Sequence, residues 1–265
     1  MFRDKIVWIT GASSGIGREM AIQFAGMGAH VAVSARRKER LKDLVKEIEQ
    51  LGQKALAVPC DVTIEEEVER AVEKIISHFG RLDIAVANSG FGVGGKIESL
   101  SADDWRRQLD VNVVGLTSTI KHSLPYLRKS GGRVVLMGSV AAMISSPHGA
   151  PYGASKAAVR AIGQVVSMEL HGSGVSCTTI HPGFIESEIG QVDNNGVYRP
   201  EWQDKRPKDL MWPADKAVKQ MLKGIKNRKR EIIITGHGKV LGFAGKHFPG
   251  LIHWATVKKL LPSPN

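Results

Sequence analysis

Short apolar runs alternate along most of this chain with segments whose apolar residues recur every three or four positions. The runs are apolar at nearly every residue, which is typical of strands covered on both faces of a sheet, and the segments between them have the period of helices. Repetition of strand and helix predicts parallel strands joined by right-handed crossovers. We therefore expect a doubly wound α/β fold. Its expected strands occupy residues 5–10, 30–35, 54–62, 82–88, 132–139, 175–183 and 231–236.

The polar residues also predict where some helices begin. Thr63 and Glu66 have the spacing of a capping box, which places the start of a helix just after the third strand. A long helix is expected to begin near Ser101 and another near Tyr152. In a doubly wound sheet the ligand crevice lies beyond the carboxyl ends of the strands, so the chemistry is expected in the residues that follow each strand.

The first strand leads into a glycine-rich turn, within the sequence WITGASSGIG at residues 8–17. Glycines between a strand and a helix let a pyrophosphate approach the bare backbone at the positive end of the helix. The alternative is a tight turn that needs glycine only for a positive φ angle. The strand–turn–helix context favours dinucleotide binding, and the candidate cofactor residues are Gly11, Ser13, Ser14, Gly15, Ile16 and Gly17.

Two arginines follow the second strand, where a chain that binds NAD usually has an acidic residue for the adenine ribose. Arg36 and Arg37 come before the first acidic residue of this segment, Glu39. A guanidinium can hold a 2′-phosphate through two hydrogen bonds, whereas a carboxylate would repel it. The pattern predicts NADP(H) as the cofactor, and the alternative is that the arginines merely begin an exposed helix.

The third and fourth strands end in further candidates for the cofactor site. Asp61 can accept a hydrogen bond from the adenine amino group while Val62 packs on the ring, but an aspartate at this place is equally typical of a helix cap. Asn88 and Gly90 belong to the turn ANSG at residues 87–90. We expect this turn of small residues to lie beside the cofactor.

The fifth strand ends at Ser139, and the next helix carries Tyr152 and Lys156 one turn apart on one face. A phenol with a pKa of about 10 is a weak acid–base catalyst at neutral pH, and a nearby ammonium favours the phenolate. In a reduction Tyr152 would protonate the forming alkoxide, and Ser139 would hydrogen-bond the same oxygen. Asn112, on the preceding long helix, is expected to hold a water joined to Lys156.

These residues together resemble the short-chain dehydrogenase/reductase family, in its compact branch with TGxxxGxG and YxxxK motifs. The resemblance covers residues 5 to about 190 and implies a Rossmann-type sheet with a catalytic tetrad of Asn112, Ser139, Tyr152 and Lys156. Ala87 and Ser89 stand where the family usually has Asn and Ala, and both changes are small. The matching residues are Thr10, Gly11, Gly15, Gly17, Asp61, Asn88, Gly90, Asn112, Ser139, Tyr152, Lys156, Pro182 and Gly183.

The resemblance also extends the expected cofactor site. It implies that Lys156 binds the nicotinamide ribose, with Tyr152 beside it. Ile185 and Ser187 are expected to flank the carboxamide, and Pro182 and Gly183 precede them at the same strand end.

Composition bounds the class of protein. The 265 residues are 42% hydrophobic and no linker, repeat or low-complexity tract divides them, so we expect one domain over residues 1–265. The start of the chain lacks a secretory or transmembrane apolar stretch, which predicts a cytoplasmic protein. Cys60 and Cys177 lie far apart and form no C-x-x-C motif, so neither a disulfide framework nor a metal site is expected.

Residues 184–212 lie between two regular elements and have a length that suits a mobile substrate lid. Their apolar side chains, with others from neighbouring strand ends, predict a pocket for a lipophilic ketone or secondary alcohol, whether steroid-like, long acyl or aromatic. The alternative is that these side chains only pack the lid on the core. The candidate substrate-binding residues are Phe91, Ser139, Val140, Tyr152 and Phe184.

The formal charge of +11 is concentrated late in the chain, because 14 Lys and Arg residues accompany only 5 Asp and Glu residues from residue 200 onward. Apolar and basic residues mix in a C-terminal extension at about 237–265, and a basic run, KNRKR, occupies 226–230. This composition suits a surface that contacts anionic membranes, but packing over the cleft or against a sister subunit is the favoured explanation. Basic runs alone are weak motifs for nucleic acid, which is not an expected partner. The family resemblance implies a homo-oligomer, a dimer or tetramer, formed through the helices that begin near Ser101 and Tyr152.

The sequence therefore predicts an NADP(H)-dependent oxidoreductase that transfers hydride between the nicotinamide and a carbonyl or secondary alcohol. Reduction is the expected direction because cellular NADPH usually drives reductions. Two alternatives stay open, namely an NAD-dependent alcohol dehydrogenase and a dinucleotide-binding scaffold without catalysis. A scaffold has no need of Ser139, Tyr152 and Lys156 together.

Overall fold

Seven parallel strands form one sheet in the computed structural model, which describes residues 2–260 and, for residues 259 and 260, the backbone alone. The strand order is β3-β2-β1-β4-β5-β6-β7, so the order reverses between β1 and β4. The predicted doubly wound Rossmann-type fold with about seven strands is thereby confirmed. The strands are β1 (Ile6–Thr10), β2 (His30–Ser34), β3 (Ala55–Ala57), β4 (Ile84–Ala87), β5 (Arg133–Met137), β6 (Ser176–Pro182) and β7 (Glu231–Ile234).

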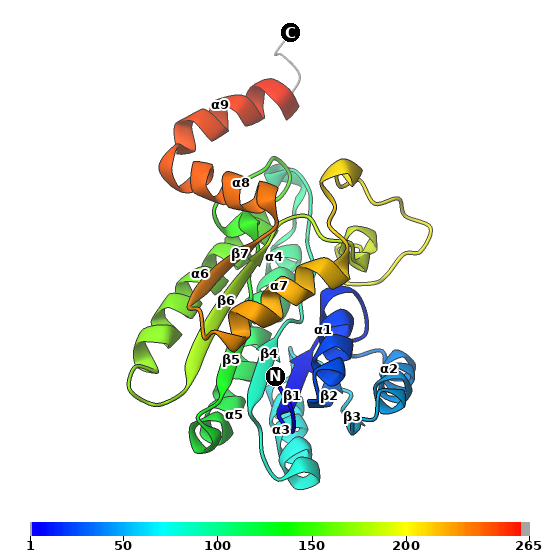
Figure 1. The fold of residues 1–265 in the computed structure, drawn as a ribbon. Helices are drawn as coiled ribbons and strands as arrows, with labels where there is room; N and C mark the ends of the chain where they lie inside the picture. The colour runs from blue at the N-terminus through cyan, green and yellow to red at the C-terminus, as the bar shows by residue number, and fades with distance from the viewer. Residues whose placement is uncertain (1, 261–265) are drawn as a thin grey trace.

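Helices cover both faces of this sheet (Figure 1). α1, α2 and α7 pack on one face, and α3, α5 and α6 pack on the other. The two cores explain the continuous apolar runs, because in β1 Val7 and Ile9 enter the first core while Ile6 and Trp8 enter the second. The helices are α1 (Gly15–Gly26), α2 (Lys38–Gln50), α3 (Glu65–Phe79), α4 (Ala102–Leu109), α5 (Gly115–Ser130), α6 (Ala150–Glu169) and α7 (Ala214–Lys226).

The third strand and the helix after it differ from the sequence prediction. β3 is only three residues long, and Pro59, inside the expected strand 54–62, has no N–H to donate to a strand ladder. The capping box predicted at Thr63 and Glu66 is wrong. Thr63 instead donates from its N and its Oγ1 to Asp61 Oδ1, at 3.0 and 2.8 Å, and α3 begins only at Glu65.

A π-helical turn interrupts the long helix predicted from Ser101. Ser101 and Asp104 form a capping box at the start of α4, and the turn Asp110–Val114 joins α4 to α5. A π-turn widens a helix by one residue and is frequent at functional sites. This one carries Asn112, whose side chain is completely buried.

α8 (Gly236–His247) and α9 (Pro249–Leu260) follow β7, and α9 extends beyond the body of the molecule at the top of Figure 1. The basic run 226–230 lies apart from these helices, at the other end of β7, where the strands of the sheet begin. There Arg228 donates to the carbonyl oxygens of Gly131 and Gly174, at 2.7 and 2.8 Å, just before β5 and β6. Within residues 2–260, no helix combines the length and the apolar character that crossing a bilayer requires. Exposed apolar side chains on α8 and α9 are Val240, Phe243, Phe248, Leu251 and Trp254.

Candidate active site

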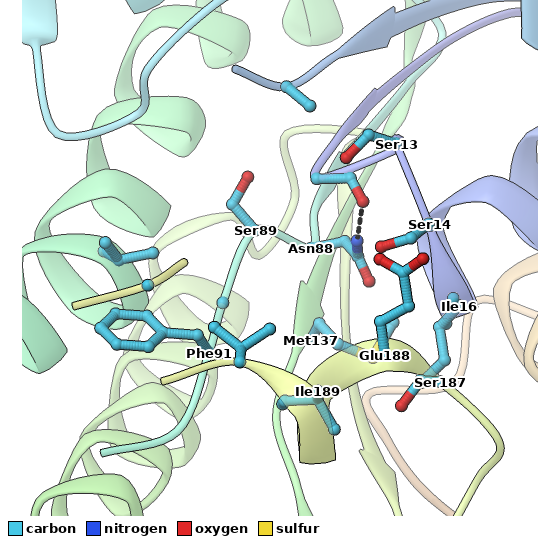
Figure 2. Close-up of a pocket in the computed structure, with 18 of the residues that line it drawn as sticks. Ser13, Ser14, Ile16, Asn88, Ser89, Phe91, Met137, Ser187, Glu188 and Ile189 are labelled. Carbon is cyan, nitrogen blue, oxygen red and sulfur yellow. Dashed lines mark hydrogen bonds between the residues drawn. The ribbon is translucent and has the colours of Figure 1, made fainter. Parts of the chain in front are cut away.

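A cavity of about 660 Å³ opens at the carboxyl ends of the strands. Its walls come from the segments after β1 to β6 and from residues 184–212, which we call the lid. In Figure 2, Ser14 of the glycine turn lies close to the carboxylate of Glu188 from the lid, and both residues line this cavity. All the residues that the sequence predicts for the cofactor line it: Gly11, Ser13, Ser14, Gly15, Ile16, Gly17, Arg36, Arg37, Asp61, Val62, Asn88, Gly90, Tyr152, Lys156, Pro182, Gly183, Ile185 and Ser187.

The glycine turn needs glycine for two physical reasons. Gly11 and Gly15 have φ angles of +67° and +53°, which side chains disfavour. A Cβ atom at Gly11 would also lie 2.8 Å from the Ser89 Cα, and one at Gly17 would lie 2.5 Å from Asn88 Nδ2. The turn thus needs glycine for its positive φ, as the alternative proposes, and also for the close approach of the segment after β4. The approach of a pyrophosphate stays a prediction.

The start of α1 fits a phosphate group. Ser14, at the N-cap, makes no capping hydrogen bond with its side chain, and the first turn of α1 has no acidic residue. The N–H groups of this turn therefore present partial positive charge beside the cavity. A pyrophosphate group of a dinucleotide matches these N–H groups in charge.

Two predicted cofactor residues also have structural partners. Asn88 donates from Nδ2 to the carbonyl oxygens of Thr10 and Gly11, at 2.9 and 3.2 Å, and so ties the segment after β4 to the glycine turn; Figure 2 marks a hydrogen bond of Asn88 with dashes. Asp61 accepts from Thr63 in the turn before α3. Asp61 therefore orders the turn before α3, but the alternative of a helix cap is wrong, because the N-cap of α3 is Ile64. Asp61 lines the cavity, and its adenine contact stays a prediction.

The arginines after β2 point to different partners. Arg37 donates to Ser13 Oγ from Nε and Nη2, at 3.1 and 2.8 Å, and to Ser14 Oγ at 2.8 Å. Arg36 instead donates to the carbonyl oxygen of Gly196 in the lid, at 2.9 Å. A third arginine, Arg40, stands one helical turn after Arg37 and is not among the predicted site residues. Arg40 forms an ion pair with the Glu188 carboxylate of the lid, which Arg37 also binds. That helical spacing is the signal that could have revealed Arg40.

Ser139, Tyr152 and Lys156 line the cavity on its inner side. Ser139 begins a short turn after β5, where its Oγ accepts from the Ala141 N–H at 3.1 Å. The imidazole of His181 on β6 also holds Ser139 in place. Its Nδ1 lies 3.0 Å from the Ser139 carbonyl oxygen and must carry the proton, because a carbonyl oxygen only accepts hydrogen bonds. Neither contact uses the proton of the Ser139 hydroxyl, which hydrogen-bonds the Tyr152 phenol.

The electrostatics of the Tyr152–Lys156 pair differ from the sequence expectation. Burial raises the pKa of Tyr152, opposed by a hydrogen bond with Ser139 and by the charge of Arg206 from the lid. Burial lowers the pKa of Lys156 to about 8. Its ammonium lies 5.8 Å from the Tyr152 ring centroid and donates to the Met137 carbonyl oxygen at 2.8 Å. Arg206, which no sequence motif marks, therefore joins the charges around the phenol.

Asn112 stands behind the cavity and does not line it. Its Oδ1 accepts from the Phe91 N–H at 3.1 Å, and its Nδ2 donates to the Phe91 carbonyl oxygen and to Ser155 Oγ, each at 3.0 Å. It thereby joins the segment after β4 to α6. A Cβ at Gly90 would lie 3.2 Å from Asn112 Oδ1 and 3.5 Å from Lys156 Nζ, so the two side chains flank this glycine. The water between them stays a prediction.

The structure divides the predicted substrate residues. Phe91, Ser139 and Tyr152 line the cavity, whereas Val140 and Phe184 do not. Val140 is buried in the turn after β5, and the ring of Phe184 stacks on His237 of α8, with 5.6 Å between centroids. The lid contributes the apolar residues Ile189, Val192, Val197 and Tyr198, together with the polar residues Asn195 and Arg206.

Known proteins resemble most of this chain. The sequence profile described as short chain dehydrogenase matches residues 5–197. The 11-beta-hydroxysteroid dehydrogenase 1A of Arabidopsis thaliana is 41% identical over 190 residues, which are 71% of this chain and 54% of that protein. The match therefore spans about half the length of that relative.

Solved structures resemble nearly the whole chain. A short chain dehydrogenase from Burkholderia cenocepacia, in complex with NADP, is 27% identical with a TM-score of 0.80 and covers 90% of this chain and 99% of its own. A short chain dehydrogenase/reductase from Burkholderia phymatum, in complex with NAD, has a TM-score of 0.84 and covers 96% of each chain. At 24% identity, this second likeness concerns the fold alone.

Proposed function

Because the chain belongs to the short-chain dehydrogenase/reductase family, we propose that it is an oxidoreductase that interconverts a carbonyl compound and an alcohol. The convergence of Ser139, Tyr152 and Lys156 on the cavity that the glycine turn borders is the observation that carries this proposal. A scaffold that only bound a dinucleotide would need the glycine turn but not these three side chains.

Tyr152, Ser139 and Lys156 have different roles in the proposed reaction. A bound nicotinamide dinucleotide supplies or accepts the hydride. Tyr152 donates its proton to the carbonyl oxygen in a reduction, and the O–H of Ser139 stabilises the negative charge that develops on that oxygen. The Lys156 ammonium, beside the phenol, stabilises the phenolate that remains.

Reduction is the direction that we propose. It rests on the proposed NADP(H), because cellular NADPH usually drives reductions. The acid–base residues themselves can serve either direction, since the phenol gives a proton in reduction and the phenolate takes one in oxidation.

We propose NADP(H) as the cofactor. Arg37 lies against Ser13 and Ser14, and Arg40 lies one helical turn further on, so two guanidinium groups and two hydroxyl groups gather beside the glycine turn. This donor set suits the dianionic 2′-phosphate and offers no carboxylate of α2 for a ribose hydroxyl. The alternative is NAD, which the Burkholderia phymatum protein binds.

A lipophilic ketone is the substrate class that the cavity favours. The lid lines it with Ile189, Val192 and Val197, and Phe91 enters from the segment after β4. The relative from Arabidopsis thaliana carries the name of a hydroxysteroid dehydrogenase, which supports a bulky apolar substrate such as a steroid-like ketone.

A panel of carbonyl compounds tests the proposal, with NADPH oxidation followed by absorbance. We expect turnover of steroid-like, long acyl or aromatic ketones, and little turnover of small sugars, because an apolar pocket leaves sugar hydroxyls unpaired. Equal turnover of sugars and ketones would overturn the substrate class. If NADPH binds tightly and no compound is reduced, the enzymatic proposal fails.

A second proposal concerns the surface of α8 and α9, which we propose binds anionic membranes. Val240, Phe243, Phe248, Leu251 and Trp254 are 52–68% exposed there. No acidic residue follows Glu231 in the sequence, whereas lysines recur among these apolar residues. Exposed aromatic and aliphatic side chains interleaved with lysine suit the interface of an anionic bilayer.

Vesicle sedimentation tests this surface. The protein is expected to sediment with phosphatidylglycerol vesicles at low salt and not with phosphatidylcholine vesicles, because the lysines require anionic lipid. The double variant Phe243→Glu/Trp254→Glu is expected to bind at least about tenfold more weakly, since each ring loses its apolar burial. Ile97→Glu, an equally exposed apolar position in the short helix before α4, is the control. Equal binding of the double variant and the control would refute the proposal.

We also propose that the chain forms a homo-oligomer through α4, α5 and α6, as the family resemblance implies. Exposed apolar side chains on this side support it: Val114, Val165 and Met168.

A further inference from the structure

Glu188, in the lid, binds the two arginines beside the glycine turn. Its Oε2 accepts from Arg37 Nη1 at 2.9 Å, and its Oε1 accepts from Arg40 Nη1 at 2.6 Å. A hydrogen bond with Ser14 also helps to lower the pKa of this carboxyl group, and Figure 2 shows the carboxylate close to Ser14. One lid carboxylate thus binds Arg37 and Ser14, which line the cavity, and Arg40 of α2.

These donors are the same groups that we assign to the cofactor phosphate. Arg37 and Ser14 contact Glu188, and Arg40 offers it a second charge-assisted hydrogen bond. A phosphate brought to the same donors would meet a carboxylate of like charge, and the two anions repel at such short range. We propose that Glu188 is an internal competitor of the cofactor 2′-phosphate, which must displace it to bind.

The competition involves the whole lid, because further lid residues contact the same arginines. The Tyr198 ring lies 5.9 Å from the Arg37 guanidinium carbon and 5.3 Å from that of Arg40, and the Gly196 carbonyl oxygen accepts from Arg36. Displacement of Glu188 therefore removes two ion pairs from the lid end that adjoins α2 and leaves the contacts of Gly196 and Tyr198 there.

The far side of the lid is held independently. The side chain of Asn194 exchanges two hydrogen bonds with the backbone of Gly94, each 3.0 Å long, and Arg107 donates to the Asn194 carbonyl oxygen. Because this attachment involves none of the arginines after β2, the lid can loosen at Glu188 while it remains attached beside the substrate residues. Binding of the cofactor phosphate then loosens the end of the lid at Glu188.

This inference rests on the proposed use of NADP(H), and a binding experiment separates the two. The probes are 2′,5′-ADP and 5′-AMP, which differ only in the 2′-phosphate, titrated calorimetrically into the wild type, Glu188→Gln and Glu186→Gln. Glu186 is an exposed acid two residues away that controls for net charge. The wild type is expected to prefer 2′,5′-ADP. Glu188→Gln is expected to bind 2′,5′-ADP about two- to fivefold more tightly, the range for loss of a partly exposed ion pair, with 5′-AMP unchanged.

The titrations distinguish failure of the NADP(H) assignment from failure of the competition at Glu188. If the wild type does not prefer 2′,5′-ADP, the NADP(H) assignment fails. If it does and Glu188→Gln binds 2′,5′-ADP no better than Glu186→Gln, the competition is overturned.

Hydrogen exchange reports the lid without any turnover. We expect 2′,5′-ADP to speed amide exchange in residues 186–199 of the wild type, and Glu188→Gln to exchange faster there even without the probe, because its lid lacks the ion pairs. Slower exchange in the variant, or no change in either protein, would contradict the loosening of the lid.

Discussion

Replacing Tyr152 by phenylalanine is expected to lower kcat for ketone reduction by about 10²- to 10⁴-fold, the usual contribution of a positioned general acid. The phenylalanine ring fills the same space on α6, so the cavity and the glycine turn keep their shape and NADPH still binds. The loss should therefore appear in kcat while the dissociation constant of NADPH, measured by quenching of protein fluorescence, changes little.

Tyr126→Phe is the matched control for this substitution. Tyr126 packs against the second core from α5 and does not line the cavity, so removal of its hydroxyl should leave kcat unchanged. If Tyr152→Phe keeps more than about a tenth of the wild-type kcat, Tyr152 is not the general acid.

Arg37→Gln is expected to weaken NADPH binding by about 10- to 100-fold, because a charged hydrogen-bond partner of a phosphate contributes roughly 1.5–3 kcal/mol. Binding of NADH, which lacks the 2′-phosphate, should stay nearly constant. The ratio of the dissociation constants of NADPH and NADH therefore tests directly whether Arg37 binds the 2′-phosphate. General damage to the site would weaken both cofactors and leave this ratio unchanged.

Lys38→Gln controls for the removal of one positive charge near the cavity. Lys38 adjoins Arg37 in the sequence but is exposed at the start of α2 and does not line the cavity. If Arg37→Gln weakens NADPH and NADH equally, or no more than Lys38→Gln does, then Arg37 does not recognise the 2′-phosphate.

The fold was predictable because its cause is local in the sequence. A strand covered on both faces must be apolar at consecutive positions, as Val7 and Trp8 of β1 are, and no tertiary contact is needed to recognise that pattern. The edge strand β3 was predicted too long because the apolar run there continues past Pro59, and the residues beyond it follow the turn of Asp61 instead of a ladder.

The gathering of the strand-end residues was predictable for a geometric reason. Parallel strands bring their carboxyl ends to one edge of the sheet, so Ser139 and Asn88 had to come close to the glycine turn. Single side chains were harder to assign. Phe184 and Ile185 are neighbours, and in extended backbone such neighbours point in opposite directions; Ile185 lines the cavity and Phe184 packs on α8.

The lid contacts were beyond sequence reasoning. Glu188 meets Arg37 across about 150 residues of chain, and Arg206 reaches the surroundings of Tyr152 across about 50. No periodicity or motif records such pairs, because the path of an irregular segment depends on the contacts that it makes. The inferred competition at Glu188 comes from the structure alone for this reason.

The position of the Tyr152 hydroxyl against a bound ketone tests the central claim most directly. A crystal of the protein with oxidised cofactor and a ketone, a pair that cannot react, gives the distance from Tyr152 Oη to the carbonyl oxygen. We predict about 2.6–3.2 Å, with Ser139 Oγ at a similar distance from the same oxygen. A ketone bound in the cavity with the Tyr152 hydroxyl directed away from its oxygen would contradict the proposed chemistry.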